Sequence, residues 1–236
     1  MTTTTHSLDQ VIVPVTTVNG NASLDKEIFG QMLKGRDYLL IGSQLFFERE
    51  EQYFITRIDH DSQTYTNEDY QLLPFNAPYQ LINGQLVFMA SPLDKHQQIL
   101  GDLNFLVASF VRKYKIGQVR FAPLDVHFDE ENIFQPDLLF ISNERINIIQ
   151  RFIHGAPDLI VEVLSSNKKH DLEDKKDIYG KYNVLEYWAI DYDKETLAQY
   201  INEERELKLE RMYQAEEEVQ SRVLEGFSFV LREIFE

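Results

Sequence analysis

A short apolar run with one carboxylate inside it sets the strongest limit on the fold. Residues 157–165 read PDLIVEVLS, and Glu162 is the only charged residue among the aliphatic side chains of 159–164. Continuous apolar runs of this length are typical of strands that are covered on both faces. An ionised carboxylate buried there without a partner would be costly, so Glu162 must be neutralised by protonation, by a cationic neighbour or by a metal ion.

Length and composition fit one well-buried domain with room for an appendage. The chain has 236 residues, of which 43% are hydrophobic. No apolar run approaches the roughly 20 residues that span a bilayer, and the polar start MTTTTHSLDQ lacks the plan of a signal peptide. We therefore expect a cytoplasmic protein with no membrane partner.

The absence of cysteine narrows the chemistry that the chain can perform. Without cysteine there is no disulfide framework and no thiolate chemistry. Any metal site must then use oxygen or imidazole ligands, which favours Mg²⁺ or Mn²⁺ over structural zinc.

The charge is strongly acidic overall but locally basic in one segment. A net charge of −16 argues against broad adhesion to nucleic acid or to anionic membranes. Residues 103–124 nevertheless contain no Asp or Glu. The cations in this segment are Arg112, Lys113, Lys115 and Arg120. They fit two interpretations equally well: a helix end whose dipole they complement, or a surface that contacts phosphates.

The pattern divides the chain into an N-terminal extension, residues 1–62, and a core domain, residues 63–236. The extension combines an apolar VIVPV, an amphipathic segment at 23–40, and strand-like segments at 44–47 and 52–56. In the core, Asn83–Gly84 predicts a two-residue hairpin turn within YQLINGQLVFM. Helices are predicted at 66–73, 95–114 and 171–183, and strands at 119–128, 134–141, 158–164 and 186–192.

The C-terminal part is rich in helix formers, yet its side chains alternate. Leu207 and Leu209 alternate with charged residues, and LAQYI before them is strand-like. This predicts a C-terminal β-meander. The fold class is accordingly a mixed α/β or α+β core, with a central mixed β-sheet flanked by helices.

Two carboxylates and a lysine form the candidate catalytic set. Asp137 begins one predicted strand and Glu162 lies in the next, so neighbouring strands can bring both carboxylates to one end of a sheet. Mg²⁺ is commonly held by one or two carboxylates together with waters and phosphate oxygens. Lys175 shares a helical face with Leu172 and Tyr179 and is predicted to point inward, whereas Lys176 should be more exposed. An inward lysine can hold an attacking water or offset charge on a phosphorane-like transition state.

Several motifs together resemble the Uma-two family, a restriction-endonuclease-like group in the PD-(D/E)xK nuclease superfamily. In chain order they are YQLINGQLVFM with a following His96–Gln97, QPDLLFIS, GAPDLIVEVLS and HDLEDKKDIYGKYNVLEYWAID. The resemblance runs from about residue 65 to residue 235. It implies a restriction-endonuclease-like core and a magnesium-dependent endonuclease that acts on DNA. A homodimer would suit an enzyme that cuts both strands of a duplex.

The resemblance assigns roles to individual residues. Asp137 and Glu162 match the metal-binding acids, and Lys175 matches a lysine that has moved onto the helix, since Leu164 occupies the usual lysine position. Gln80 stands where an additional acidic ligand is expected, and Gln85 also replaces an acidic residue. Such a site leaves open an alternative function, a catalytically weakened nuclease fold that binds DNA or protein.

Several of the candidate site residues could instead have a purely structural role. Glu162 and Lys175 can form a buried ion pair without any catalysis. His96 shares a helical face with Leu100 and Leu103 and is predicted to point into the core, where its hydrogen bonds would be satisfied. The family resemblance suggests the alternative that His96 lies near the active site. Asp125, in the strand predicted at 119–128, is likewise either a structural residue or a neighbour of the site. Gln80, His96 and Asp125 are therefore the candidates for side chains that contact and orient the metal ligands.

Overall fold

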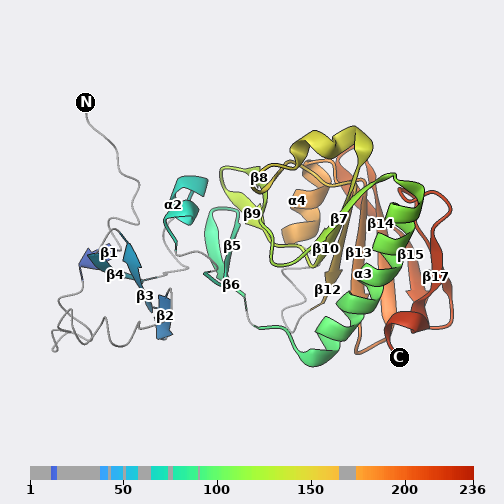
Figure 1. Ribbon diagram of the computed structural model, residues 1–236, viewed down its shortest axis with the longest axis horizontal. Coiled ribbons are helices and arrows are strands. Elements are labelled where there is room, and N and C mark those ends of the chain that lie inside the picture. Colours follow the sequence, from blue (N-terminus) through green and yellow to red (C-terminus); the bar gives the residue numbers. More distant parts are fainter. Residues whose placement is uncertain are drawn as a thin grey trace. The chain divides into compact units, whose positions relative to one another are not determined.

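Two units make up the chain in the computed structural model (Figure 1). The structure describes residues 12–14, 38–41, 44–49, 52–57, 65–73, 77–89, 91–164 and 174–236. The first unit comprises residues 1–89 with 130–132, and the second comprises residues 90–129 with 133–236. Within the described ranges, no helix is both long and apolar enough to cross a membrane.

The N-terminal part of the first unit contains an antiparallel sheet. Its strands, in the order in which they pair, are β1 (Ile12–Pro14), β4 (Gln52–Arg57), β3 (Gln44–Arg49) and β2 (Tyr38–Ile41). The two strand-like segments predicted here are confirmed as β3 and β4, while the last residues of the amphipathic segment form β2. The predicted boundary after residue 62 lies outside the described residues and stays a prediction.

The rest of the first unit follows its local sequence signals. Its elements are α2 (Asn67–Leu72), β5 (Tyr79–Ile82) and β6 (Gln85–Phe88). Thr66 caps α2 in a capping box with Asp69. Asn83 and Gly84 both have positive φ, as a two-residue hairpin turn requires, so the predicted hairpin is confirmed.

A mixed six-stranded sheet forms the centre of the second unit. In spatial order its strands are β15 (Glu206–Gln214), β14 (Thr196–Glu203), β13 (Glu186–Asp191), β12 (Leu159–Val163), β10 (Leu138–Ser142) and β7 (Gly117–Phe121). Neighbouring strands are antiparallel except β12 and β13, which are parallel. The predicted mixed sheet and the C-terminal meander are therefore confirmed.

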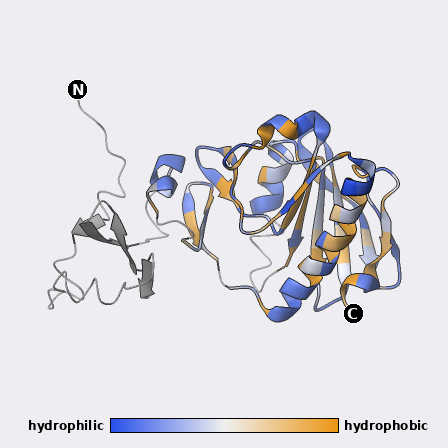
Figure 2. Cartoon of the chain, in the orientation of Figure 1, coloured by the Kyte–Doolittle hydropathy of each residue, from blue (hydrophilic) through white to orange (hydrophobic). Residues whose placement is uncertain are grey.

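Helices cover the two faces of this sheet. One face packs on α3 (Asp94–Tyr114), whose buried Leu103 and Val107 join Leu138, Val161 and Trp188 in the hydrophobic core. Figure 2 shows the hydrophobic colour running along the central strands. On the opposite face lies α4 (Lys175–Lys181). The remaining elements are β8 (Val126–Asp129), β9 (Asn132–Phe134), η2 (Asn143–Ile148), β11 (Ile153–His154), β16 (Glu218–Gln220), β17 (Ser228–Val230) and η4 (Leu231–Ile234).

Two details differ from the predicted strands. The strand predicted at 119–128 is divided into β7 and β8 around Pro123, which has no N–H to donate to a ladder. In β15, Leu207 is buried but Leu209 is 55% exposed. Both leucines lie in the regular stretch of the β14–β15 pairing, before the register shift at Gln199–Tyr200, and α4 packs on β15 close to Leu207 at Gly180.

Candidate active site

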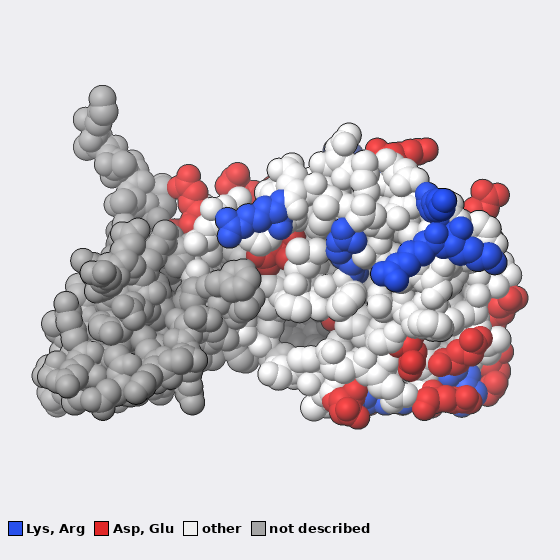
Figure 3. All heavy atoms as spheres, viewed as in Figure 1, with Lys and Arg blue, Asp and Glu red and all other residues white. Residues whose placement is uncertain are grey.

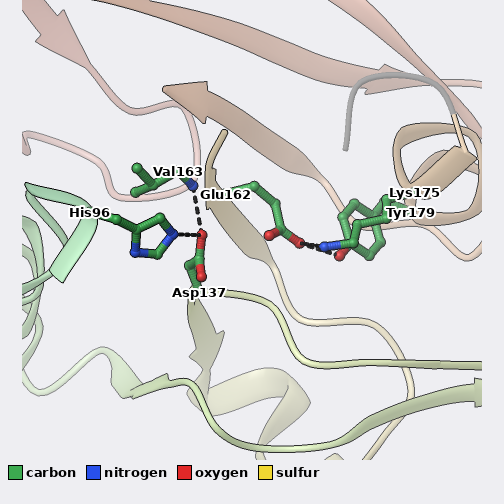
Figure 4. Close-up of polar contacts among 6 residues, drawn as sticks. All are labelled: His96, Asp137, Glu162, Val163, Lys175 and Tyr179. Carbon is green, nitrogen blue, oxygen red and sulfur yellow. Dashed lines mark hydrogen bonds and ion pairs between the residues drawn. The ribbon is translucent and has the colours of Figure 1, made fainter. Parts of the chain in front are cut away.

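Asp137 and Glu162 are placed side by side by two neighbouring antiparallel strands. Leu138 of β10 pairs with Val161 of β12. Continuing this register by one residue sets Asp137 opposite Glu162. Side chains of directly opposed residues lie on the same face of a sheet, close enough to interact. Figure 4 shows the two carboxylates next to each other, as the sequence predicts.

The carboxylate of Asp137 is held in place by two groups. Its Oδ2 accepts a hydrogen bond from the Val163 backbone N–H at 2.7 Å and lies 3.2 Å from Nε2 of His96. His96 comes from the first turn of α3 and is buried, so the prediction that it faces inward is confirmed. Burial lowers the pKa of His96, but the hydrogen bond to Asp137 and the charges of Asp137 and Glu162 outweigh it and raise the pKa above the ordinary value.

The carboxylate of Glu162 is held from the other side by α4. Its Oε1 accepts hydrogen bonds from Lys175 Nζ at 3.1 Å and from the Tyr179 hydroxyl at 2.7 Å. Both side chains of the Glu162–Lys175 ion pair are almost fully buried, with 4% and 6% exposed. Lys176 is half-buried and pairs with Asp177. The predicted facing of this helix is therefore confirmed, while a catalytic role for Lys175 stays a prediction.

Tyr179 is a site residue that the sequence analysis treated only as core. It is fully buried, and its hydroxyl shares Glu162 Oε1 with Lys175. Its position four residues after Lys175 on the inward face of the helix was the available signal. A tyrosine among apolar residues on such a face needs a hydrogen-bond partner for its hydroxyl, and Glu162 supplies one here.

The chemistry of these side chains fits a magnesium or manganese ion. Asp137 and Glu162 provide hard oxygen donors on one face of the sheet. The hydrogen bond between His96 and Asp137, together with the negative charge of both carboxylates, raises the pKa of His96. Among the described residues, no group of three or more His, Asp or Glu side chains is arranged to hold a metal. Two protein carboxylates are nevertheless the usual number for Mg²⁺, which keeps waters and substrate oxygens as its other ligands.

The other predicted supporting residues occupy distinct places. Gln80 is buried on β5 of the first unit. Asp125 lies between β7 and β8 in the second unit, where its Oδ1 accepts a hydrogen bond from Gln135 Nε2 at 2.8 Å. His96, by contrast, lies 3.2 Å from the Asp137 carboxylate. The roles of Gln80 and Asp125 stay predictions.

Asp158, at the opposite end of β12 from Glu162, has a structural partner set. Its carboxylate accepts hydrogen bonds from the backbone N–H of Ser142 at 2.7 Å and from the Ser142 hydroxyl at 3.1 Å. Arg145 Nε lies 3.5 Å from the same carboxylate. Asp158 therefore ties the start of η2 to β12 and offers a matched control for Asp137.

The four predicted cations lie where α3 ends and β7 runs. Arg112 and Lys113 are in the last turn of α3, so they complement its dipole, as one of the two interpretations requires. Arg120 lies on β7 and is not explained by the helix. Figure 3 shows Lys and Arg side chains gathered on this face, over the region where α3 ends in Figure 1.

Known proteins add an independent line of information. The profile of the Uma2 family, described as "Putative restriction endonuclease", matches residues 67–232, which contain the whole constellation above. The chain belongs to the Uma2 family. The Uma2 resemblance seen in the sequence motifs is thereby confirmed.

The fold of this Uma2 chain also has a counterpart among solved structures. A crystal structure from Anabaena variabilis described as a "putative nuclease" superposes with a TM-score of 0.62 at 19% sequence identity. The match covers 72% of this chain and 97% of that one. At this identity the likeness establishes the fold alone. No curated protein is similar enough in sequence to match the chain.

Proposed function

We propose that the protein is a cytoplasmic, metal-dependent endonuclease that hydrolyses phosphodiester bonds of DNA. The observation that carries the proposal is the Asp137–Glu162 pair with a buried lysine on Glu162. Burying two carboxylates and an ammonium in one place costs stability, and well-packed apolar residues would serve folding as well or better. Such a cluster is therefore better explained by chemistry than by packing.

Each side chain has a part in this chemistry that follows from its contacts. Asp137 and Glu162 would hold the metal ion, which supplies a Lewis acid for the phosphate and lowers the pKa of a bound water. The Val163 N–H and His96 fix the orientation of the Asp137 carboxylate. Tyr179 fixes that of Glu162, and Lys175, 3.1 Å from Glu162, would donate to the attacking water or to a phosphate oxygen.

Metal binding is expected to stabilise the fold through Asp137. A ligand that binds only the folded state at a hundred times its Kd adds about 2.7 kcal/mol, which corresponds to roughly 5 to 10 °C in Tm for a domain of this size. The Tm of the wild type should rise by this amount in saturating Mg²⁺ or Mn²⁺. The Asp137→Ala variant should show no rise. Differential scanning calorimetry with and without EDTA measures both.

Asp158→Asn is the control for this experiment, because Asp158 is a buried carboxylate just before β12 that binds Ser142, at the end of β10 opposite to Asp137. It should lower Tm without metal and keep the full metal-dependent rise. Equal metal shifts in the wild type and Asp137→Ala would contradict the assigned metal ligands. Cleavage of plasmid and of linear DNA in Mg²⁺ and in Mn²⁺ tests the reaction itself, and a protein that binds DNA but never cleaves it would favour the weakened, binding function.

A further inference from the structure

A groove runs over the surface of the second unit between α3 and β7. It has a volume of about 500 Å³. Its helical wall uses one face of α3, with residues four apart, and its other wall is β7, an edge strand of the six-stranded sheet. The lining residues that matter below are Phe105 and Arg112 on α3 and Arg120 and Phe121 on β7.

Two aromatic rings on the walls are unusually open to solvent. Phe105 is 70% exposed and Phe121 is 56% exposed. Exposing a phenylalanine ring to water is unfavourable in free energy, and large exposed apolar side chains that gather in one place mark binding surfaces. Both rings line the same groove, so their exposure calls for a ligand with flat apolar faces.

The two arginines of this groove differ from the cations on the C-terminal meander and the segment after it. There, Lys208, Arg211 and Arg222 each form an ion pair with a glutamate. Within the described part of the chain, Arg112 and Arg120 form no ion pair with a carboxylate. Arg120 donates hydrogen bonds to the Val119 carbonyl and to the Gln118 side chain, which hold its guanidinium but do not neutralise its charge. In a protein with a net charge of −16, cations without a carboxylate partner beside open aromatic rings are complementary to a polyanion that carries flat rings.

The groove begins next to the candidate active site. Phe121 pairs with Leu138, the residue that follows Asp137, and the backbone N–H of Ala122 donates to the Asp137 carbonyl at 3.0 Å. The Phe121 end of the groove therefore lies beside the backbone of Asp137, within the second unit.

We propose that the groove between α3 and β7 binds an unpaired strand of nucleic acid, with bases stacked on Phe105 and Phe121 and phosphates contacted by Arg112 and Arg120. The proposal rests on the proposed nuclease function for its choice of substrate class, and it adds where and in what form that substrate is held. Aromatic side chains stack on bases only where the base faces are open, as in single strands or extruded nucleotides.

The test is equilibrium binding of a fluorescent twelve-nucleotide single strand to the full-length protein in EDTA, followed by fluorescence anisotropy. Replacing both rings, Phe105→Ala with Phe121→Ala, should raise Kd by at least about tenfold. Replacing both rings by leucine should weaken binding nearly as much, because stacking rather than apolar area is lost. Replacing both arginines, Arg112→Ala with Arg120→Ala, should reduce the slope of log K against log salt by about 1.4, since each phosphate contact on a single strand contributes about 0.7.

The matched control uses the opposite edge strand of the same sheet. Leu209 and Met212 of β15 are 55% and 46% exposed, and changing both to alanine should leave Kd unchanged. Changing both groove arginines to lysine should retain the salt slope. Circular dichroism melting checks that each variant is folded.

Two results would overturn the proposal. One is a wild type that binds no single strand, or binds it with a Kd indifferent to both rings. The other is a change from dimer to monomer in the ring variants, seen by light scattering, with unchanged oligonucleotide binding; the groove would then be an interface between copies of the chain. Because binding is measured without metal, a protein that needs the rings for binding but cleaves nothing refutes the nuclease proposal and leaves the groove proposal standing.

Discussion

Lys175→Ala is expected to lower the rate of DNA cleavage by about 10² to 10³, the loss typical of removing one fixed donor from a transition state. The ammonium of Lys175 is buried and 3.1 Å from Glu162, so water cannot replace it with the same geometry. Lys176→Ala should retain cleavage within about twofold, because its side chain is half-buried and pairs with Asp177 at the surface. Single-turnover rates at saturating protein and metal measure both variants.

A purely structural ion pair makes a different prediction for the same residue. Removing Lys175 leaves Glu162 without its cation, which would cost about 3 to 5 kcal/mol of folding free energy. The double variant Glu162→Gln with Lys175→Met removes both charges and should recover much of that stability. A folded, stable Lys175→Met variant that still cleaves at the wild-type rate would end the catalytic assignment and leave the structural pair.

Glu186→Leu is expected to cost about 4 kcal/mol or more in the free energy of unfolding. Glu186 is fully buried, and its carboxylate accepts five hydrogen bonds. The donors are Trp188 Nε1, Gln199 Nε2, the Ser221 hydroxyl and the backbone N–H groups of Arg222 and Val223. Leucine would leave these donors buried without an acceptor, at about 1 to 3 kcal/mol each before relaxation.

Glu186→Gln refines the same measurement. The amide keeps one acceptor oxygen but turns an N–H₂ group toward N–H donors, so about 2 to 3 kcal/mol should still be lost. Glu225→Gln, at an exposed glutamate just after the donor segment 221–223, should change stability by less than about 0.5 kcal/mol. Urea unfolding gives all three values, and a Glu186→Leu loss no larger than that of Glu225→Gln would contradict the buried network.

Local patterns in the sequence predicted the parts of the site that depend on local periodicity. Glu162 stood out because it broke an apolar run, and the helical period separated Lys175 from Lys176. Both follow from how one element turns its side chains, which the sequence determines directly. The short helix capped by Thr66 and the Asn83–Gly84 hairpin were predictable for the same reason.

The rest of the site depends on contacts between distant segments. The pairing register that sets Asp137 opposite Glu162 joins two strands. The sequence predicted that neighbouring strands could bring both carboxylates to one end of a sheet, but it did not predict this register. The Glu186 network joins β13 to residues 199 and 221–223, which no local pattern connects. The groove likewise exists because β7 is an edge strand, and strand order is a property of the whole sheet.

The single parallel pair in the sheet, β12 with β13, has a consequence for how the site can change. Parallel neighbours cannot be joined by a tight turn, so the chain must cross a face of the sheet between them, and here that crossing carries α4. Asp137 and Glu162 belong to the sheet, whereas the amine of Lys175 arrives on the connection. The two carboxylates and the lysine therefore belong to different elements, the sheet and the connection that carries α4. A substitution or a shift by one helical turn in α4 can move or remove the lysine without changing the strand pairing that holds the carboxylates.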